Sequence, residues 1–418
     1  MLNWDETPAL EPMRCARAWV EINRSAIAHN VSAIKALLAP HTDLMAVVKA
    51  DAYGHGAVTV AQTALRSGAS WLGVATVPEG IELRQAGIEA PILVMGAVND
   101  PAEVRAIAYW QLQPTIVNPK QALVFSETLA AYAAERAERG RQAMVVEQAS
   151  LSVPVHLKLD TGMSRLGFSW QRPVELARLV QQLAHLETVS VYSHLATADD
   201  PDPTVMQQQH ERFERATSAL DRAGLLPPRR HLANTAATLS SPALHHDMVR
   251  VGLATYGLYP APHLRSAVDL QPVLEVKARI THLKTIPAGA GVSYSHQFIA
   301  PQTMKIAVLG IGYADGIPRI LSNRLEGVLQ GQRVQQVGAI TMDQMMVDVS
   351  AVAAVQEGDV VTLLGQAGGH VLSADHWAEM ANTISWEILC GFKHRLPRIE
   401  IASVSMARLP EPTYKTSP

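Results

Sequence analysis

A lysine at the end of an apolar segment is the first residue of this chain that could do covalent chemistry. Lys49 ends the predicted strand Leu44–Lys49, and a turn containing Gly54 and Gly56 leads to a predicted helix over 58–67. Apolar neighbours solvate a charged amine poorly, so they favour the neutral amine that forms Schiff bases with aldehydes. The position therefore indicates an attachment site for pyridoxal phosphate. The alternative is a lysine with a buried stem and a solvated amine.

Eight short apolar segments alternate with helix-like segments, beginning with a predicted helix over 24–38. This alternation predicts a closed parallel barrel, whereas an open doubly wound sheet usually carries a glycine fingerprint near its start, which is missing here. The predicted strands are Leu44–Lys49, Trp71–Ala75, Pro91–Met95, Gln113–Val117, Val155–Leu159, Val189–His194, Arg230–Asn234 and Met248–Leu253.

The pattern changes after Pro262, where strand-like segments follow one another with little helix between them. The fold class is therefore α/β, a (β/α)8 TIM-type barrel followed by a mainly β C-terminal domain. We expect a tail over 1–16, the barrel over 17–262, the β domain over 263–410 and a tail over 411–418. The strand-like segment Arg17–Asn23 is also a candidate strand of the β domain.

Polar residues recur at the carboxyl ends of the predicted barrel strands. Lys49, Asp160, His194 and Asn234 end four of them, and Arg250 lies in the last. Each could be a capping or solvated residue. Because barrel enzymes place their chemistry at this rim, their common placement predicts an active site there.

Composition limits the class of protein. The chain has 418 residues, 48% of them hydrophobic and 17% charged, with a net charge of -3, so neither nucleic acid nor an anionic membrane is favoured as a partner. Its two cysteines, Cys15 and Cys390, lie far apart and indicate neither a disulfide framework nor a zinc site. No secretory signal and no apolar stretch long enough to span a membrane is present, so we expect a cytoplasmic protein without a bound metal.

Several long segments resemble the alanine racemases, the pyridoxal-phosphate enzymes of fold type III, over roughly residues 17 to 408. The similar segments are Ala46–Gly56, Leu157–Gly167, Tyr192–Asp199, His231–Leu239, Val249–Leu258, Val292–Tyr294, Gly310–Gly316 and Val337–Met345. The resemblance implies pyridoxal 5'-phosphate as cofactor and interconversion of L-alanine and D-alanine, which supplies D-alanine for peptidoglycan. It also implies a homodimer whose active sites lie between the barrel of one subunit and the β domain of the other.

Two bases follow from the chemistry and the resemblance together. Inversion at a carbon is simplest with a proton donor and acceptor on each face. Lys49 is expected to bind the cofactor and to serve one face. Tyr294 resembles the second base of the family, contributed by the partner subunit; without the resemblance, it would be predicted as a core aromatic on a strand.

The resemblance also assigns binding residues. Arg165 resembles the residue that positions the substrate carboxylate, and the backbone of Met342 is expected to contact that carboxylate from the partner subunit. Lys158 matches a lysine that is often carbamylated to hold the arginine. The expected cofactor-binding residues are Lys49, Tyr53, His194, Thr235, Arg250, Gly252, Leu253 and His394.

Two of these positions have specific consequences. Arg250 is expected to face the ring nitrogen of the cofactor, where an arginine remains a donor and cannot accept a proton; the alternative is a structural salt bridge. His394 stands where many family members have a tyrosine that meets the cofactor phosphate. An imidazole donates a hydrogen bond too, but it is shorter and titrates near neutrality.

Other functions are weaker fits to the sequence. A broad-specificity amino-acid racemase is the main alternative. A decarboxylase of the same group would need a different cysteine context, and a small pyridoxal-binding homeostasis protein would lack the β domain. A Schiff-base aldolase barrel would use its lysine without a cofactor.

Overall fold

The computed structural model describes residues 17–142 and 151–401. The predicted tails 1–16 and 411–418, and Cys15, lie outside the described residues. Within this description the chain forms two compact units. We call the one that spans 26–52 and 56–271 the barrel unit.

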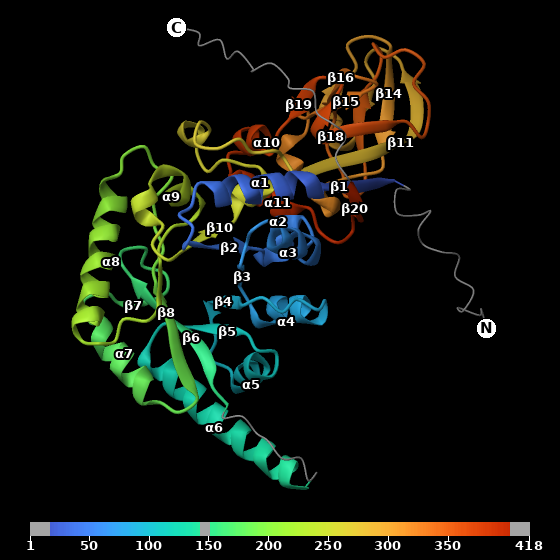
Figure 1. Cartoon of the computed structure of the whole chain (residues 1–418). Helices are drawn as coiled ribbons and strands as arrows, with labels where there is room; N and C mark the ends of the chain where they lie inside the picture. The colour runs from blue at the N-terminus through green and yellow to red at the C-terminus, as the bar shows by residue number, and fades with distance from the viewer. Residues whose placement is uncertain (1–16, 143–150, 402–418) are drawn as a thin grey trace. The chain divides into compact units, whose positions relative to one another are not determined.

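The other, which we call the strand-rich unit, contains 17–25, 53–55 and 272–401. Figure 1 labels the elements of both units along the chain. No helix of the described residues is both long enough and apolar enough to cross a membrane.

The barrel unit is built on eight parallel strands in the order β10-β2-β3-β4-β5-β6-β8-β9. Hydrogen bonds from Asp247 N to Arg230 O (3.1 Å) and from Arg250 N to Ala233 O (3.0 Å) join β10 to the chain at β9 and close the ring. The eight strands are β2 (Asp43–Val47), β3 (Trp71–Val74), β4 (Ile92–Ala97), β5 (Gln113–Ile116), β6 (Val153–Asp160), β8 (Leu186–Tyr192), β9 (Arg229–His231) and β10 (Met248–Val251). A short strand, β7 (Phe168–Ser169), pairs with the end of β6.

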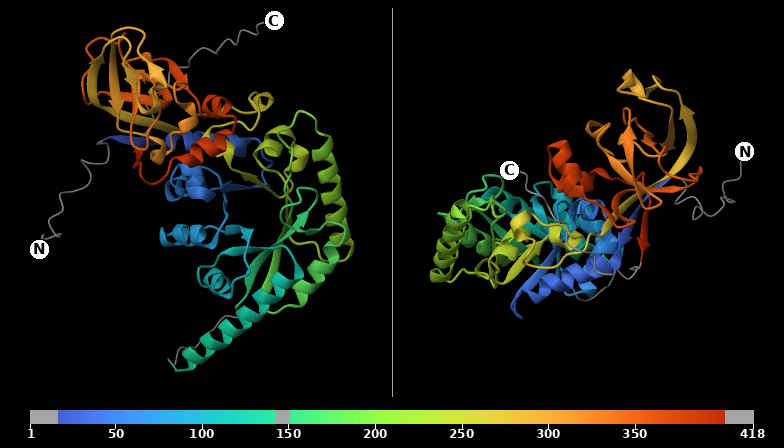
Figure 2. Two further views of the ribbon diagram at one scale, coloured as in Figure 1. Left: turned by 180° about the vertical axis from the view of Figure 1, so that it is seen from behind. Right: turned by 90° about the horizontal axis from the view of Figure 1, so that it is seen from above.

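Helices connect these strands and lie outside them, as α7 and α8 show in both views of Figure 2. The helices are α1 (Arg24–Ala36), which begins in the strand-rich unit, α2 (Lys49–Gly54), α3 (Ala57–Arg66), α4 (Val77–Gln85), α5 (Pro101–Tyr109), α6 (Pro119–Gln142), α7 (Pro173–Gln182), α8 (Thr204–Arg222) and α9 (Thr235–Ser240). The arrangement confirms the predicted barrel. Each predicted strand is present, although several end earlier than predicted: the seventh ends at His231, not Asn234.

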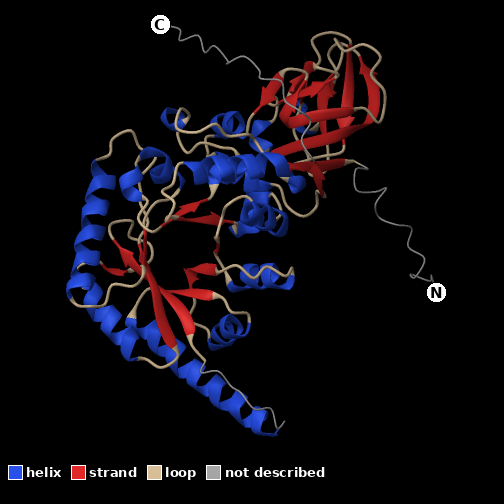
Figure 3. Cartoon of the chain, in the orientation of Figure 1, coloured by secondary structure: helices blue, strands red, loops and turns tan. Residues whose placement is uncertain are grey.

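The strand-rich unit contains one large sheet and little helix (Figure 3). Its order is β19-β18-β15-β16-β17-β14-β11-β1-β20, with a further pairing of β18 and β11. The strands are β1 (Ala18–Asn23), β11 (Leu274–Ile286), β14 (Met304–Leu309), β15 (Glu326–Leu329), β16 (Gln332–Val337), β17 (Met345–Asp348), β18 (Val360–Ala367), β19 (His370–Leu372) and β20 (Arg398–Ile401). The pair β12 (Gly291–Val292) and β13 (Phe298–Ile299) and the helices α10 (Ala374–Ala381) and α11 (Ser385–Gly391) complete it.

The first strand of the chain belongs to this sheet. β1 pairs antiparallel with β11, with Val20 opposite Val276, and parallel with β20. Val20 and Val276 are both fully buried. Both backbone edges of this early segment are therefore paired with strands more than 250 positions later in the chain.

A buried carboxylate organises the loops of the strand-rich unit. Asp315 is fully buried and accepts two hydrogen bonds from Arg17, from Nη1 (2.8 Å) and Nη2 (2.7 Å). The amide of Gly312 donates to it (3.0 Å), and Arg395 Nε lies 3.4 Å from it. Arg395 also donates to Asp343 (2.7 Å), so this ion-pair network joins the beginning of the unit to two later loops.

Replacing this carboxylate should destabilise the strand-rich unit. Asp315→Asn keeps the shape but turns an amide toward the guanidinium of Arg17, which leaves a partly buried donor without an acceptor. We expect a loss of about 2–4 kcal/mol in unfolding free energy, measured by urea denaturation. Asp343→Asn is the matched control: its carboxylate is exposed and should contribute less than about 1 kcal/mol. Equal effects of the two substitutions would contradict this account.

Candidate active site

The barrel unit holds a buried arginine that has no carboxylate partner among the described residues. Arg250 lies in β10 and is 3% exposed. Its Nη2 donates to the carbonyl oxygens of Ser193 (2.8 Å) and Leu232 (3.2 Å), and its Nη1 donates to that of His231 (3.2 Å). Burial lowers the pKa of Arg250 to about 10, so the guanidinium is still charged at neutral pH. It is therefore not part of a structural salt bridge.

Two histidines contact this guanidinium, and burial together with its charge keeps them neutral. Nδ1 of His231 lies 3.0 Å from Arg250 Nη1, and Nδ1 of His194 lies 3.1 Å from Nη2. Burial, followed by the charge of Arg250, lowers the pKa of each imidazole well below its usual range. Since a guanidinium only donates, both Nδ1 atoms accept, and each neutral ring carries its proton on Nε2.

This assignment fixes the direction of a hydrogen-bond chain through the barrel core. His231 Nε2 donates to Ser190 Oγ (2.9 Å), so that hydroxyl donates to His156 Nδ1 (2.5 Å). His156 Nε2 then donates to Gln113 Oε1 (2.9 Å). Burial, followed by the charge of Arg229, lowers the pKa of His156 to about 3. One charged group thus orders donors and acceptors across four strands.

Four cationic side chains act on one another at the carboxyl ends of the strands. The pKa of Lys158 is lowered to about 8, first by burial and then by the charges of Arg250, Arg165 and Lys49, in that order of importance. Asp160 is the one acid that opposes this shift. Lys158 and Arg250 both lie over the ring of Tyr192, each 5.2 Å from its centroid. The structure therefore gathers Lys49, Lys158, Arg165 and Arg250, together with His194, into an electropositive site.

The turn after Lys49 differs from the glycine-interrupted turn that the sequence predicts. Residues Ala50 to Tyr53 all have φ between 52° and 55°, so the segment labelled α2 is left-handed. Ala52 N donates to Val48 O (2.9 Å). A left-handed helical conformation costs roughly 1–2 kcal/mol for each residue with a side chain. Strain of this kind persists where surrounding contacts stabilise it, and it is concentrated at functional sites.

Glu79 supplies one of those contacts, although the sequence analysis did not select it. Its Oε1 accepts a hydrogen bond from the amide of Ala50 (2.8 Å), next to Lys49. Its Oε2 accepts from the amides of Ala75 (2.7 Å) and Thr76 (3.1 Å). The spacing Thr76-x-x-Glu79 is the capping-box pattern at the start of a helix. This pattern predicts the contacts of Glu79 at the start of α4, but it does not predict the contact with Ala50.

A hydrogen bond at the carboxyl ends of the barrel strands joins the segment after β9 to the segment after β10. The hydroxyl of Thr235 accepts a hydrogen bond from the amide of Gly252 (3.1 Å). Thr235 begins α9, and the preceding Asn234 caps that helix by accepting from the amide of Ala237 (3.1 Å). Leu253, which follows Gly252, begins a short 3-10 turn and is buried. The Thr235 hydroxyl keeps its own proton for donation to a ligand.

In the strand-rich unit, Tyr294 is not a core aromatic. It is 70% exposed and begins a short 3-10 turn between β12 and β13. The flanking residues Ser293, Ser295 and His296 have φ of 63°, 58° and 45°. Ser293 Oγ donates to Ala339 O (2.8 Å), which holds the base of this strained loop.

Met342 lies in the loop before β17 and is 53% exposed. Its carbonyl accepts from the amide of Ala314 (3.0 Å), and the neighbouring Thr341 carbonyl accepts from Tyr313 (3.0 Å). The contact of Arg395 with Asp343 holds the other side of the loop. The backbone of this loop is therefore fixed while the methionine side chain lies in solvent.

Tyr53 and the segment of His394 are tied together within the strand-rich unit. Arg398 donates to the Gly54 carbonyl from Nε (3.1 Å) and Nη2 (3.0 Å), and to the Lys393 carbonyl from Nη1 (2.6 Å). His394 is exposed, whereas Tyr53 is buried. Burial raises the pKa of the Tyr53 hydroxyl, so this group is a neutral donor at neutral pH.

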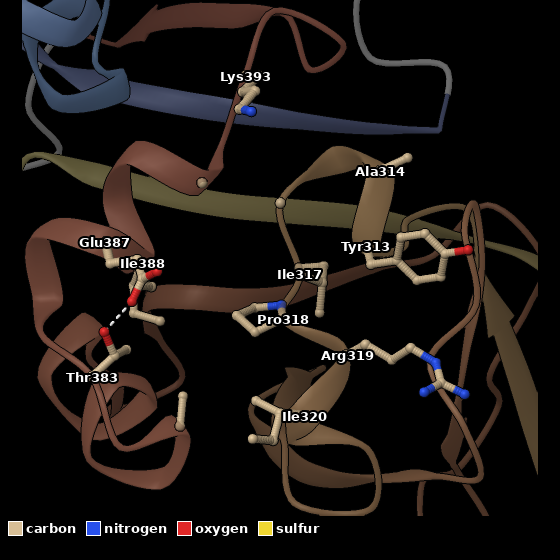
Figure 4. A pocket seen from close by; sticks show the side chains of 13 residues that line it. Tyr313, Ala314, Ile317, Pro318, Arg319, Ile320, Thr383, Glu387, Ile388 and Lys393 are labelled. Atoms are coloured by element: carbon tan, nitrogen blue, oxygen red, sulfur yellow. Dashed lines mark hydrogen bonds between the residues drawn. The ribbon is translucent and has the colours of Figure 1, made fainter.

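A separate pocket of about 560 Å³ lies elsewhere in the strand-rich unit (Figure 4). Tyr313, Pro318, Ile320 and Ile388 contribute to its wall, and Thr383 donates a hydrogen bond to Glu387 at one side. None of the predicted site residues lines it. Its lining has no cluster of cations comparable to the one at the barrel rim, so we do not assign the chemistry to this pocket.

Fold and site together define a class of protein. A closed (β/α)8 barrel carries a lysine on a strained turn, a buried arginine without a carboxylate and further cations at one rim, and a mainly β unit follows in sequence. This is the architecture of a barrel enzyme that binds an anionic cofactor or substrate at the carboxyl ends of its strands.

Comparison with known proteins identifies the family. Residues 22–260 match the family model "Alanine racemase, N-terminal domain", and residues 273–400 match "Alanine racemase, C-terminal domain". The chain is 61% identical over 385 residues to an alanine racemase of Nostoc sp., covering 92% of this chain and 96% of that one. It is 58% identical to one of Synechocystis sp., over 92% of this chain and 99% of the other. The chain belongs to the alanine racemase family.

Comparison with solved structures leads to the same family. An alanine racemase of Clostridium difficile superposes with a TM-score of 0.84 at 31% identity, covering 92% of this chain and 96% of that one. The alanine racemase of Bacillus anthracis, determined with bound L-Ala-P, gives a TM-score of 0.81 at 34% identity, with coverage of 92% and 95%.

The buried histidine chain should make stability depend on pH. Because the pKa of His156 is about 3 in the folded protein, against about 6.5 when unfolded, the unfolded chain alone takes up the proton between these values. The contribution of His156 to the free energy of unfolding is complete above pH 6.5. It decreases by about 1.4 kcal/mol per pH unit as the pH falls toward 3. The free energy of unfolding should therefore decrease between pH 7 and pH 5 by about 2 kcal/mol less in His156→Gln than in the wild type. Urea denaturation at each pH measures this difference.

Ser190→Ala serves as the control for this experiment. It removes the hydroxyl that accepts from His231 and donates to His156, but it leaves the imidazole of His156 in place. This variant should be less stable at every pH and keep the steep dependence. A wild-type slope in His156→Gln would show that the buried imidazole does not control acid stability.

Proposed function

We propose that this chain interconverts L-alanine and D-alanine with pyridoxal 5'-phosphate bound at Lys49. The observation that carries the assignment of the cofactor is the set of four cations at the barrel rim, one of which is the buried Arg250. The phosphate and ring oxygen of pyridoxal phosphate are anionic, so this donor set fits the group. When bound, the pyridine ring of the cofactor withdraws electrons from Cα of the amino acid and makes its proton acidic.

The two bases then act at opposite faces of Cα. Nζ of Lys49 takes or returns the proton on one face, and Oη of Tyr294 of the partner subunit does so on the other. A phenol that is 70% exposed in a single chain, on a loop with three residues at positive φ, suits a role completed by a second chain. We therefore propose a homodimer with shared active sites.

The remaining residues bind and orient. Tyr53, the Thr235 hydroxyl, the amides of Gly252 and Leu253, and His394 are proposed to hold the phosphate. Arg250 and His194 face the cofactor ring. Since the guanidinium has no carboxylate near it and accepts no proton, it leaves the ring nitrogen unprotonated.

Arg165 and the backbone of Met342 of the partner subunit are proposed to hold the substrate carboxylate. Lys158 is proposed to carry a carbamate. Its lowered pKa leaves more neutral amine for reaction with carbon dioxide, and a carbamate would place a negative charge among three cations. That charge would hold Arg165 in position and relieve the repulsion between Lys158 and its neighbours.

Alanine is favoured over larger amino acids, since the closely similar curated relatives are alanine racemases. Supply of D-alanine for peptidoglycan and a cytoplasmic location stay predictions. The broad-specificity alternative would show comparable turnover of serine or larger amino acids, which a comparison of kcat/KM values tests directly.

Exchange of the Cα proton for deuterium, started from each alanine enantiomer, separates the two bases. Lys49→Ala should lose exchange and racemisation in both directions, with partial rescue by an added primary amine. Tyr294→Phe should lose interconversion more than about 100-fold, because removal of a positioned acid or base costs about 10² to 10⁴. Nuclear magnetic resonance follows exchange, and polarimetry follows racemisation.

Tyr313→Phe is the control for the tyrosine, since Tyr313 is another exposed tyrosine of the same unit. It should retain racemisation within a few-fold of wild type. Full interconversion by Tyr294→Phe would remove this phenol from the mechanism, and a protein that binds no pyridoxal phosphate would overturn the proposal as a whole.

Glu79 should matter for catalysis through Lys49. Glu79→Gln replaces one acceptor oxygen with a donor, which then faces a backbone amide at either Ala50 or the start of α4. We expect kcat to fall about 10- to 100-fold, as for other residues that orient a reacting group, with a smaller change in KM. Glu82→Gln, one turn further along the same helix, should stay near wild type. Equal kcat in both variants would contradict a positioning role.

A further inference from the structure

Three side chains on the outside of the barrel unit converge without making a hydrogen bond to one another. His210 and Glu214 lie one turn apart on α8, and His246 lies in the loop just before β10. His210 Nε2 is 3.6 Å from Glu214 Oε1, and His246 Nε2 is 3.7 Å from the same oxygen. These distances are longer than the 2.7–3.2 Å range typical of hydrogen bonds.

The spacing fits a metal ion instead. Zinc binds histidine nitrogen and carboxylate oxygen at about 2.0–2.2 Å, so neighbouring ligand atoms of a tetrahedral site lie about 3.3–3.6 Å apart. One ligand atom from each of His210, Glu214 and His246 lies within 4.8 Å of the others. A small movement of the two partly exposed side chains on α8 would bring all three to bonding distance.

An unpartnered buried atom points to the same ligand. Nε2 of His246 is buried and has no hydrogen-bond partner within the described part of the chain, and its side chain is only 6% exposed. A buried polar atom without a partner is costly, so it needs a ligand, a water molecule or an ion. The neighbouring His245, by contrast, has a hydrogen bond between its Nε2 and Thr238 O (2.9 Å).

The other charged groups nearby leave the three ligands available. Arg230 donates to Asp247 (3.2 Å), so that carboxylate is already paired. A neutral imidazole has a lone pair for a metal on the nitrogen that carries no proton. Phe213 packs against the ring of His246, with centroids 5.3 Å apart, and holds its orientation.

We propose that His210, Glu214 and His246 bind a divalent transition-metal ion of the zinc class, with water in the fourth position. Two imidazoles and one carboxylate favour such an ion over magnesium or calcium, which prefer oxygen ligands. The site lies at the amino end of β10, whereas Arg250 and Gly252 lie at its carboxyl end. Its effect is therefore structural: it joins α8 to the loop that leads into the strand of Arg250.

The test uses the holoenzyme after treatment with a chelator. Zinc titrated into the wild type by calorimetry should bind at one ion per chain and raise the thermal midpoint of unfolding. Cobalt at the same site should give the visible bands of a tetrahedral ion. His210→Gln and Glu214→Gln change the two partly exposed ligands, 28% and 43% exposed, and should weaken zinc binding at least about tenfold and abolish the thermal shift.

His376→Gln is the matched control, because His376 and Glu379 form an exposed histidine–glutamate pair at 4.0 Å without a third ligand. This variant should bind zinc as the wild type does. Failure of the wild type to bind zinc in a 1:1 ratio would overturn the proposal, as would equal binding by His210→Gln and Glu214→Gln. Circular dichroism of each variant confirms that the fold is kept.

Discussion

The burial of an uncompensated positive charge is the constraint on which the barrel interior depends. Arg250 is surrounded by carbonyl oxygens and neutral imidazoles, with no carboxylate among the described residues that contact it. A charge in such a place is stabilised only if every neighbour presents an acceptor. That requirement fixes the protons of His231 and His194 on Nε2, and through His231 it orders the chain that ends at Gln113.

Repulsion among the cations of the rim affects both the stability of the barrel and its affinity for an anion. The cations that make the rim attractive for an anionic cofactor also repel one another, and this repulsion adds to burial in lowering the pKa of Lys158. An anionic ligand or a carbamate lowers the repulsion, so the barrel should be more stable when loaded. The left-handed turn after Lys49 also lowers the stability of the barrel unit. Glu79 offsets part of this strain by accepting a hydrogen bond from the amide of Ala50.

Sequence analysis predicted the barrel strands because alternating apolar segments and helices leave little choice of architecture. It did not predict the handedness of the turn at Lys49, since Ala50, Ala52 and Tyr53 carry no preference for positive φ, and the turn is held by an acceptor 29 residues later. His156, Ser190 and Gln113 were also missed. Inward-facing polar residues in short strands have no spacing signal, and only the closed barrel brings them together.

The exposed residues of the strand-rich unit suit an interface with another chain. Tyr294 lies on a loop of this unit and is 70% exposed in a single chain. Three residues beside it, Ser293, Ser295 and His296, have positive backbone φ, and the ion-pair network of Asp315 and Arg395 fixes the loop of Met342. Rigid backbone under exposed side chains is what an interface residue requires, because little conformational entropy is then lost on association. In the proposed homodimer, such a loop would meet the cation-rich rim of the partner's barrel unit.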